Sequence, residues 1–192
     1  MSLGEDGRRV KAFRNVAVGE NLAYLAMKEE GVAVFDITEP GEPRHVTTIH
    51  RNTPAPRNWG LLSFNFTDIA VAGRHIFLAD ESQKPSGAKL YVVDMQDPQN
   101  PRFVNRTSFQ LRTHHIHLEQ IWGKNLIFTA ERIPVDDFPL KILDVTDPYN
   151  IVVLARISKN TIGLVSVHDV YVQRKNTPFG LKYWLYVSAF GS

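Results

Sequence analysis

The sequence predicts an all-β fold built from repeated small sheets, and three observations support this. An aspartate followed three residues later by an acidic residue and then a proline occurs three times, beginning at Asp36, Asp94 and Asp144. Each copy follows a mostly apolar run of four residues, as a short strand would. The copies are 58 and 50 residues apart. A period of that order, made of short strands and turns, is typical of a β-propeller or a related array.

Each full unit contains four short stretches that are rich in β-branched and aromatic residues and bounded by Gly, Asn, Asp or Pro. After an N-terminal lead at 1–12, the repeats occupy 13–192, with blades at about 13–50, 66–107, 116–157 and, incompletely, 167–192. The first strand of the third unit is expected at 120–123. The last unit is expected to have strands at 167–172 and 183–189, joined by a polar loop at 173–182.

Three full units and a partial fourth rarely close a propeller ring by themselves. A propeller that does not close leaves an exposed sheet edge. We therefore expect a fragment of a larger propeller, of about six to eight blades, truncated at its C-terminus. An open array, or a dimer that closes the ring, is the alternative.

The repeated phrase is explained by turn chemistry. Proline presets φ and cannot continue a central strand, and an aspartate at a strand end accepts bonds from turn N–H groups. We therefore expect Asp36, Asp94 and Asp144 to be structural. A ligand or metal role is the alternative.

The units resemble the LVIVD repeat. The segment LYVVDMQDPQNP at 90–101 is the nearest match to that pattern, and GVAVFD at 31–36 is nearly as good. The third unit departs from it, with Lys141 inside the apolar run and Ile151 in place of the second proline. The resemblance covers about 13–190 and implies a β-propeller, often in exported or surface proteins of bacteria or archaea. It implies no particular chemistry.

Composition excludes several classes. The 192 residues (21.8 kDa) are 43% hydrophobic with a net charge of +2 and scattered Lys and Arg, so we expect no nucleic-acid partner. The absence of cysteine excludes disulfides and thiol chemistry. No stretch has the roughly 20 apolar residues of a membrane span, and no signal peptide is recognisable in this chain. An extracellular or cell-envelope location is implied by the family resemblance alone.

A polar residue precedes the first apolar pair of each unit when the units are aligned on the aromatic residue of their second strand. These residues are Asn15, Asp68, Glu119 and Asp169. In a propeller the first strand lies nearest the central channel. The four groups could coordinate a cation through oxygen, but bonds to turn N–H groups or to a channel water are the favoured interpretation.

Histidines gather near the first strands of the last two units. His115 and His117 alternate by two and so share one face of a strand. Together with His168 and Asp169 from the next unit, they form a candidate site for a divalent metal such as Zn, Fe, Cu or Mn. His-x-His is a weak signal by itself, and the competing interpretation is a set of satisfied polar residues.

Two tryptophans are candidate binding residues. Trp59 lies in the long link 51–65, and Trp122 lies in the first strand expected in the third unit. Exposed loops on a rigid scaffold commonly carry binding function, and either ring could give a ligand a flat platform. Packing between blades is the commoner use. The stretch 132–139 is a second candidate rim.

No hydrolase elbow, phosphate loop, HExxH or dinucleotide fingerprint is found in the sequence. We therefore favour a non-catalytic binding or scaffold module with a protein or glycan partner. The alternative is a metal-dependent oxidoreductase or hydrolase with His115, His117 and His168 near the propeller axis.

Overall fold

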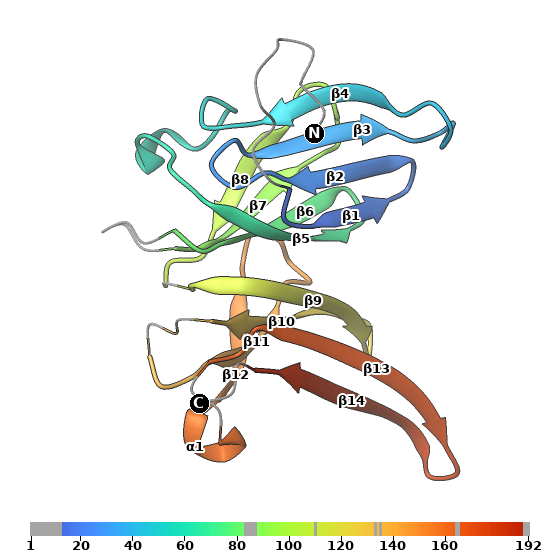
Figure 1. The fold of residues 1–192 in the computed structure, drawn as a ribbon, viewed down its shortest axis with the longest axis vertical. Helices are drawn as coiled ribbons and strands as arrows, with labels where there is room; N and C mark the ends of the chain where they lie inside the picture. The colour runs from blue at the N-terminus through green and yellow to red at the C-terminus, as the bar shows by residue number, and fades with distance from the viewer. Residues whose placement is uncertain are drawn as a thin grey trace.

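The computed structural model describes residues 13–82, 88–109, 111–132, 134, 136–163 and 166–189, which form an all-β fold (Figure 1). The all-β prediction is confirmed. The described residues contain only two single-turn helices, η1 (Arg57–Trp59) and α1 (Lys159–Ile162). No helix in these ranges is both long and apolar enough to cross a membrane.

The strands form three four-stranded sheets and one two-stranded sheet, and neighbouring strands are antiparallel and consecutive in the chain. The first sheet contains β1 (Val16–Gly19), β2 (Leu22–Ala26), β3 (Val32–Asp36) and β4 (Arg44–Ile49). The second contains β5 (Phe66–Ala72), β6 (His75–Asp80), β7 (Leu90–Asp94) and β8 (Arg102–Arg106). The third contains β9 (Thr113–Ile121), β10 (Lys124–Glu131), β11 (Leu140–Asp144) and β12 (Val152–Ile157). The fourth contains β13 (Asp169–Thr177) and β14 (Gly180–Ser188).

The hairpins of the third and fourth sheets are longer than the sequence predicted. β9 begins at Thr113, and Trp122 with Gly123 forms the turn to β10, where both residues have positive φ (51° and 78°). The stretch 173–182 is not a loop, because its ladder continues to the pair Thr177↔Gly180. Its polar side chains are compatible with a strand because this end of the hairpin is largely exposed.

The aspartates of the repeated phrase cap the same turn in all three units. In each unit the Asp Oδ1 accepts the N–H of the residue two positions later, at 2.8 to 3.0 Å, in the pairs Asp36–Thr38, Asp94–Gln96 and Asp144–Thr146. The residue after each aspartate donates its N–H to a backbone carbonyl in, or just after, the turn between the unit's first two strands. These bonds support the structural interpretation and join the two turns at one end of each sheet.

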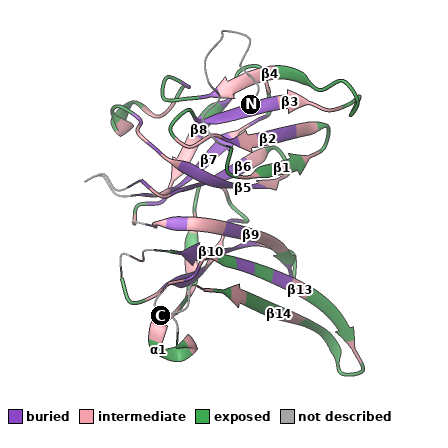
Figure 2. Cartoon of the chain, in the orientation of Figure 1, coloured by how far each residue is buried: buried purple, intermediate pink, exposed green. Residues whose placement is uncertain are grey.

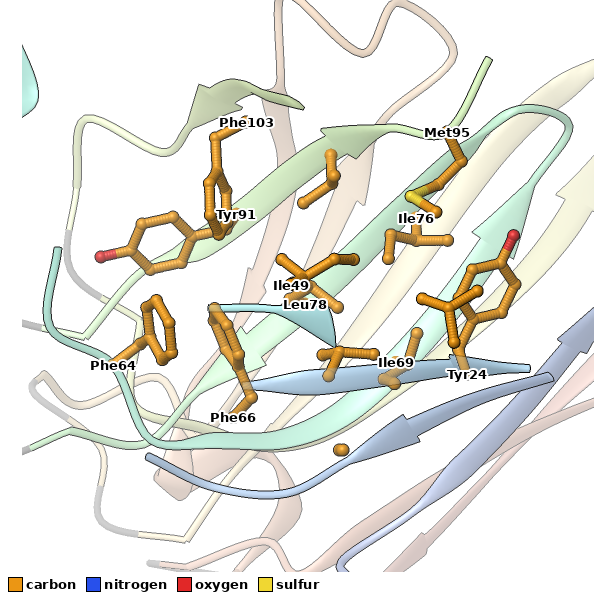
Figure 3. Close-up of a cluster of buried hydrophobic side chains, with 14 of the residues drawn as sticks. Tyr24, Ile49, Phe64, Phe66, Ile69, Ile76, Leu78, Tyr91, Met95 and Phe103 are labelled. Carbon is orange, nitrogen blue, oxygen red and sulfur yellow. The ribbon is translucent and has the colours of Figure 1, made fainter. Parts of the chain in front are cut away.

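Consecutive sheets pack face to face through three apolar clusters. The first and second sheets enclose the cluster in Figure 3, in which Phe64 and Phe66 stack at 4.1 Å and contact Tyr91. The opposite face of the second sheet packs on the third, and the third packs on the fourth. In Figure 2, β5 is mostly buried and β14 is mostly exposed. The fourth sheet is therefore the least enclosed part of the stack.

Candidate functional site

The first strands of the four sheets, β1, β5, β9 and β13, lie side by side in chain order (Figure 1). A polar residue stands at the equivalent register position in each of β5, β9 and β13, and directly before β1, opposite a small residue of the second strand. In the last three sheets the pairs are Asp68↔Ala79, His115↔Ala130 and Asp169↔Ser188. In the first sheet Asn15 accepts a backbone bond from Ala26. We call Asn15, Asp68, His115 and Asp169 the polar row.

The sequence alignment predicted Glu119 as the member of the polar row in the third sheet. The structure places His115 there instead. Glu119 pairs with Leu126, four rungs further along the hairpin. The alignment assumed a constant spacing to the aromatic residue of the second strand. That spacing is longer in the third sheet because β9 and β10 extend beyond the hairpins of the first two sheets.

The polar row is continuous through side-chain contacts. The Asn15 amide donates a hydrogen bond to Asp68 Oδ1. His115 Nε2 lies 3.3 Å from Asp68 Oδ2, and His115 Nδ1 lies 2.8 Å from Asp169 Oδ1. One imidazole thus bridges carboxylates from the second and fourth sheets.

Asp68 is the buried centre of this row, with 1% of its side chain exposed. Burial raises the pKa of its carboxyl, while the charge of His115 and the N–H bonds from Ile116 (2.7 Å) and Ile69 (2.8 Å) act in the opposite direction. Because Ile116 belongs to the third sheet, Asp68 also fixes the register between the second and third sheets.

A groove of about 580 Å³ follows the four first strands. Each residue that lines it lies on a first strand or directly before one, and the polar row is part of its wall. Beyond the row, the rings of His117 and Tyr171 meet edge to face at 4.9 Å. Burial lowers the pKa of His117, with the nearby Glu119 opposing the shift. The groove therefore combines carboxylates, imidazoles and an exposed phenol.

His114 and His168 each directly precede a member of the polar row, His115 and Asp169, and they form a pair of their own. The rings of His114 and His168 are 4.5 Å apart, and His114 Nδ1 is 3.1 Å from Glu81 Oε2. Burial and the neighbouring His114 lower the pKa of His168. A smaller cavity of about 210 Å³ joins this pair to Asn15, His115 and Asp169.

The four predicted metal ligands are divided between these two places. His115, His117 and Asp169 line the groove, whereas His168 packs at a tilt against His114 and lines only the smaller cavity. Within the described residues, no three His, Asp or Glu side chains are arranged to hold a metal ion. The residue that sequence reasoning did not join to this set is Asp68, the nearest carboxylate to His115 Nε2.

The two tryptophans lie at different sheet junctions. Trp59 packs against Tyr91 and Phe103, with the guanidinium of Arg106 4.7 Å from its ring centroid. Trp122 is 85% exposed on the β9–β10 turn, and its ring lies edge-on to Tyr183 at 6.0 Å. The contacts of Trp59 are those of a packing residue, whereas Trp122 offers an open ring.

The described residues of the candidate rim at 132–139 are held by ion pairs and hydrogen bonds to the rest of the fold. Lys141, 1% exposed, bonds Glu131 Oε1 at 2.5 Å, Asp136 Oδ1 at 3.0 Å and the carbonyl of Phe138 at 2.8 Å. Asp137 pairs with Lys159 at 2.7 Å. Asp136 therefore anchors this stretch to the third sheet, and Asp137 anchors it to α1.

Comparisons with known proteins agree with the repeat seen in the sequence. A family model, the LVIVD repeat, matches residues 12–49, which confirms the predicted resemblance for the first unit. No curated protein matches the chain. Among solved structures, the crystal structure of the computationally designed Ika8 protein matches with a TM-score of 0.52 and 11% identity. The match covers 84% of this chain and 40% of that one, so this chain spans less than half of the designed protein's length. Residues 12–49 thus match the LVIVD repeat, and most of the chain is similar in fold to that designed protein.

Proposed function

We propose that the chain forms part of a β-propeller and acts as a non-catalytic binding module, whose ligand lies in the groove along the first strands. The observation that carries this proposal is the continuous polar row Asn15–Asp68–His115–Asp169 in the wall of that groove. A location at the cell surface or in an envelope compartment is the setting that the LVIVD resemblance implies.

The repeated packing of the sheets supports the propeller. Each junction stacks one sheet face on the next, and each sheet begins with the strand that borders the groove. Blades arranged around an axis, with the first strand innermost, would have these features. Rims and channels of rigid scaffolds of this kind are common places for ligands.

The groove favours a ligand that donates several hydrogen bonds. Its carboxylates are acceptors, and Asp169 is half exposed at 53%. Tyr171 and His117 add ring surface beside them. A glycan combines hydroxyl donors with an apolar ring face, so we propose a glycan as the ligand class.

A glycan array followed by isothermal titration calorimetry tests the proposal. Asp169→Asn, which removes a charged acceptor, and His117→Ala, which removes ring surface, are each expected to weaken binding about tenfold. Glu42→Gln, an exposed substitution in the β3–β4 turn, serves as the matched control. Binding that survives both groove variants, or no binding to any glycan, would contradict the proposed ligand site.

The metal-dependent enzyme is the second candidate, and the contact of His115 with two carboxylates is what favours testing it. A metal would need nitrogen and oxygen donors each about 2.0–2.2 Å from the ion. Elemental mass spectrometry on protein purified without added metal, beside a variant carrying His115→Ala, His117→Ala and His168→Ala, decides the matter. A stoichiometric metal that the variant loses would favour the enzyme.

A further inference from the structure

We propose that two copies of this chain associate head to tail and close a ring, with the outer face of the fourth sheet of each copy packed on the outer face of the first sheet of the other. The inference rests on the propeller proposed above. It concerns the two ends of the sheet stack, of which the first borders the groove through Val18.

The first sheet has an apolar face that no neighbouring sheet covers. Side chains alternate along a strand, and Ala17, Tyr24 and Val34 point into the cluster shared with the second sheet. Their neighbours Val16 and Val18 point the other way and are 57% and 60% exposed. The two valines occupy successive positions on one face of β1 and so give this end of the stack apolar surface for a partner to cover.

The fourth sheet has a matching aromatic face. Val170, Val172 and Val187 point into the cluster shared with the third sheet. On the opposite face of β14, Trp184 and Tyr186 are 51% and 46% exposed. Aromatic residues of this kind dominate binding energy at protein interfaces.

The packing between consecutive sheets within one chain indicates that a second copy of the chain covers these two faces. Three junctions in the described residues join one sheet face to the next, always with neighbouring first strands. The outer faces of the first and fourth sheets end this series. Placing one on the other repeats the same contact, and two copies make eight sheets, within the four to eight blades that propellers use.

The charges of the two ends are complementary. From Val16 to Ile49 the first sheet and its turns have six carboxylates and two cationic side chains, a net charge of −4. From Asp169 to Ser188 the fourth sheet has three cationic side chains and one carboxylate, a net charge of +2. Complementary charge favours contact between unlike ends and opposes contact between like ends.

The charges also fall at the same end of the strands. In Figure 1, β1 and β13 run in the same direction. Lys175 and Lys182, paired in the ladder, lie near the turn that follows β13. Glu20 lies in the turn that follows β1, and the β3–β4 turn with Glu39 and Glu42 is bonded to it through Ile37 and Asn21. Docking in the register of the other junctions brings these groups together.

Sedimentation velocity of the 192-residue chain, from about 1 to about 100 µM, tests the proposal. We expect a reversible species with twice the 21.8 kDa mass of the chain. Trp184→Ser with Tyr186→Ser is expected to give a monomer that keeps the β circular dichroism spectrum. Neither residue lines the groove, but the ring of Tyr186 lies 6.5 Å from that of the groove residue Tyr171. The single variant Trp184→Ser, which is expected to weaken association and to keep any glycan binding, therefore separates the two proposals.

Charge reversal gives an internal control. Lys175→Glu with Lys182→Glu is expected to raise the dimer Kd at least about tenfold, through like-charge repulsion. Adding Glu20→Lys and Glu42→Lys to the same chain is expected to restore association, which a misfolded variant would not do.

Three outcomes would overturn the inference. A wild-type chain that stays monomeric at all concentrations would leave both faces to a different partner. A dimer that both variant sets leave unchanged would use another surface. A ladder of species larger than two copies would show that the head-to-tail contact does not close into a ring.

Discussion

The backbone at Gly31 shows how one residue fixes the path of the first sheet. Its φ is +102°, and a Cβ placed there would lie 1.9 Å from the carbonyl oxygen of Ile49. Only glycine adopts this conformation without strain, and here the close approach of β4 requires it as well. The sharp turn between β2 and β3 therefore depends on a single position.

Gly31→Ala is expected to destabilise the chain by about 3 kcal/mol or more, from backbone strain and the clash with Ile49. Gly41→Ala is the matched control, because a Cβ at Gly41 meets nothing within 4 Å, and its effect is expected within about 0.5 kcal/mol. Urea denaturation of both variants checks this. Equal effects at the two positions would contradict the geometry.

His117 gives the stability of the chain a dependence on pH. Burial lowers the pKa of its imidazole in the folded state. In the unfolded chain the same imidazole has a pKa of about 6.5. Between these two values the unfolded state binds more protons, so stability falls as pH is lowered through that window and is unaffected above it. His168 acts in the same direction.

We expect the melting temperature of His117→Gln to fall less between about pH 7.5 and about pH 5.5 than that of the wild-type chain. The exposed His45→Gln is the control and should keep the wild-type slope. A slope that is the same in His117→Gln as in the wild type would show that this imidazole is not held in its neutral form.

At the scale of elements, the third sheet differs from the other two full sheets by a buried ion pair. Lys141 and Glu131, on β11 and β10, are 1% and 0% exposed. The same lysine holds Asp136 and the Phe138 carbonyl. Breaking a buried pair on one side leaves an uncompensated charge, whereas replacing both partners with apolar groups is often neutral.

Lys141→Met and Glu131→Leu are each expected to cost about 3–5 kcal/mol, and the double variant much less than their sum. The exposed pair Lys124–Asp144, at 2.5 Å, is the comparison, because Lys124→Ala should cost less than about 1 kcal/mol. Guanidinium denaturation of the four variants measures these differences. Additive single effects would show that the two charges do not compensate each other.

At the scale of the whole molecule, burial decreases toward the fourth sheet. The second sheet packs on a neighbour on both faces, whereas β13 and β14 form a two-stranded sheet packed on one face only. An isolated two-stranded hairpin is marginal in water. Local opening is therefore easiest at this end of the stack.

In hydrogen exchange at concentrations where the chain is monomeric, we expect the amides of β13 and β14 to exchange faster than those of β6 and β7. The far part of the hairpin, around Lys175 and Lys182, should exchange first because it is exposed. Raising the concentration should slow exchange in the hairpin if the two copies dock as proposed. Protection in β14 equal to that in β6 under monomeric conditions would contradict this ranking.

The local sequence determined the repeat, the turns and most of the strands. Asp36, Asp94 and Asp144 cap turns whose bonds span two residues, so their role depends only on neighbouring chemistry. The short hairpins of the first two sheets were predictable for the same reason, since apolar alternation and turn residues act over a few positions.

Only the tertiary structure decided which residues form the site. The polar row joins Asp68 to His115, 47 positions later, and His115 to Asp169, 54 positions later. Its member in the third sheet is His115 because the β9–β10 hairpin is longer, and strand pairing sets that length rather than any local motif. Trp59, which could have served as a platform, packs in a junction because the link before β5 folds back against the second sheet. Contacts between sheets depend on where whole strands meet, and no stretch of sequence within one unit carries that information.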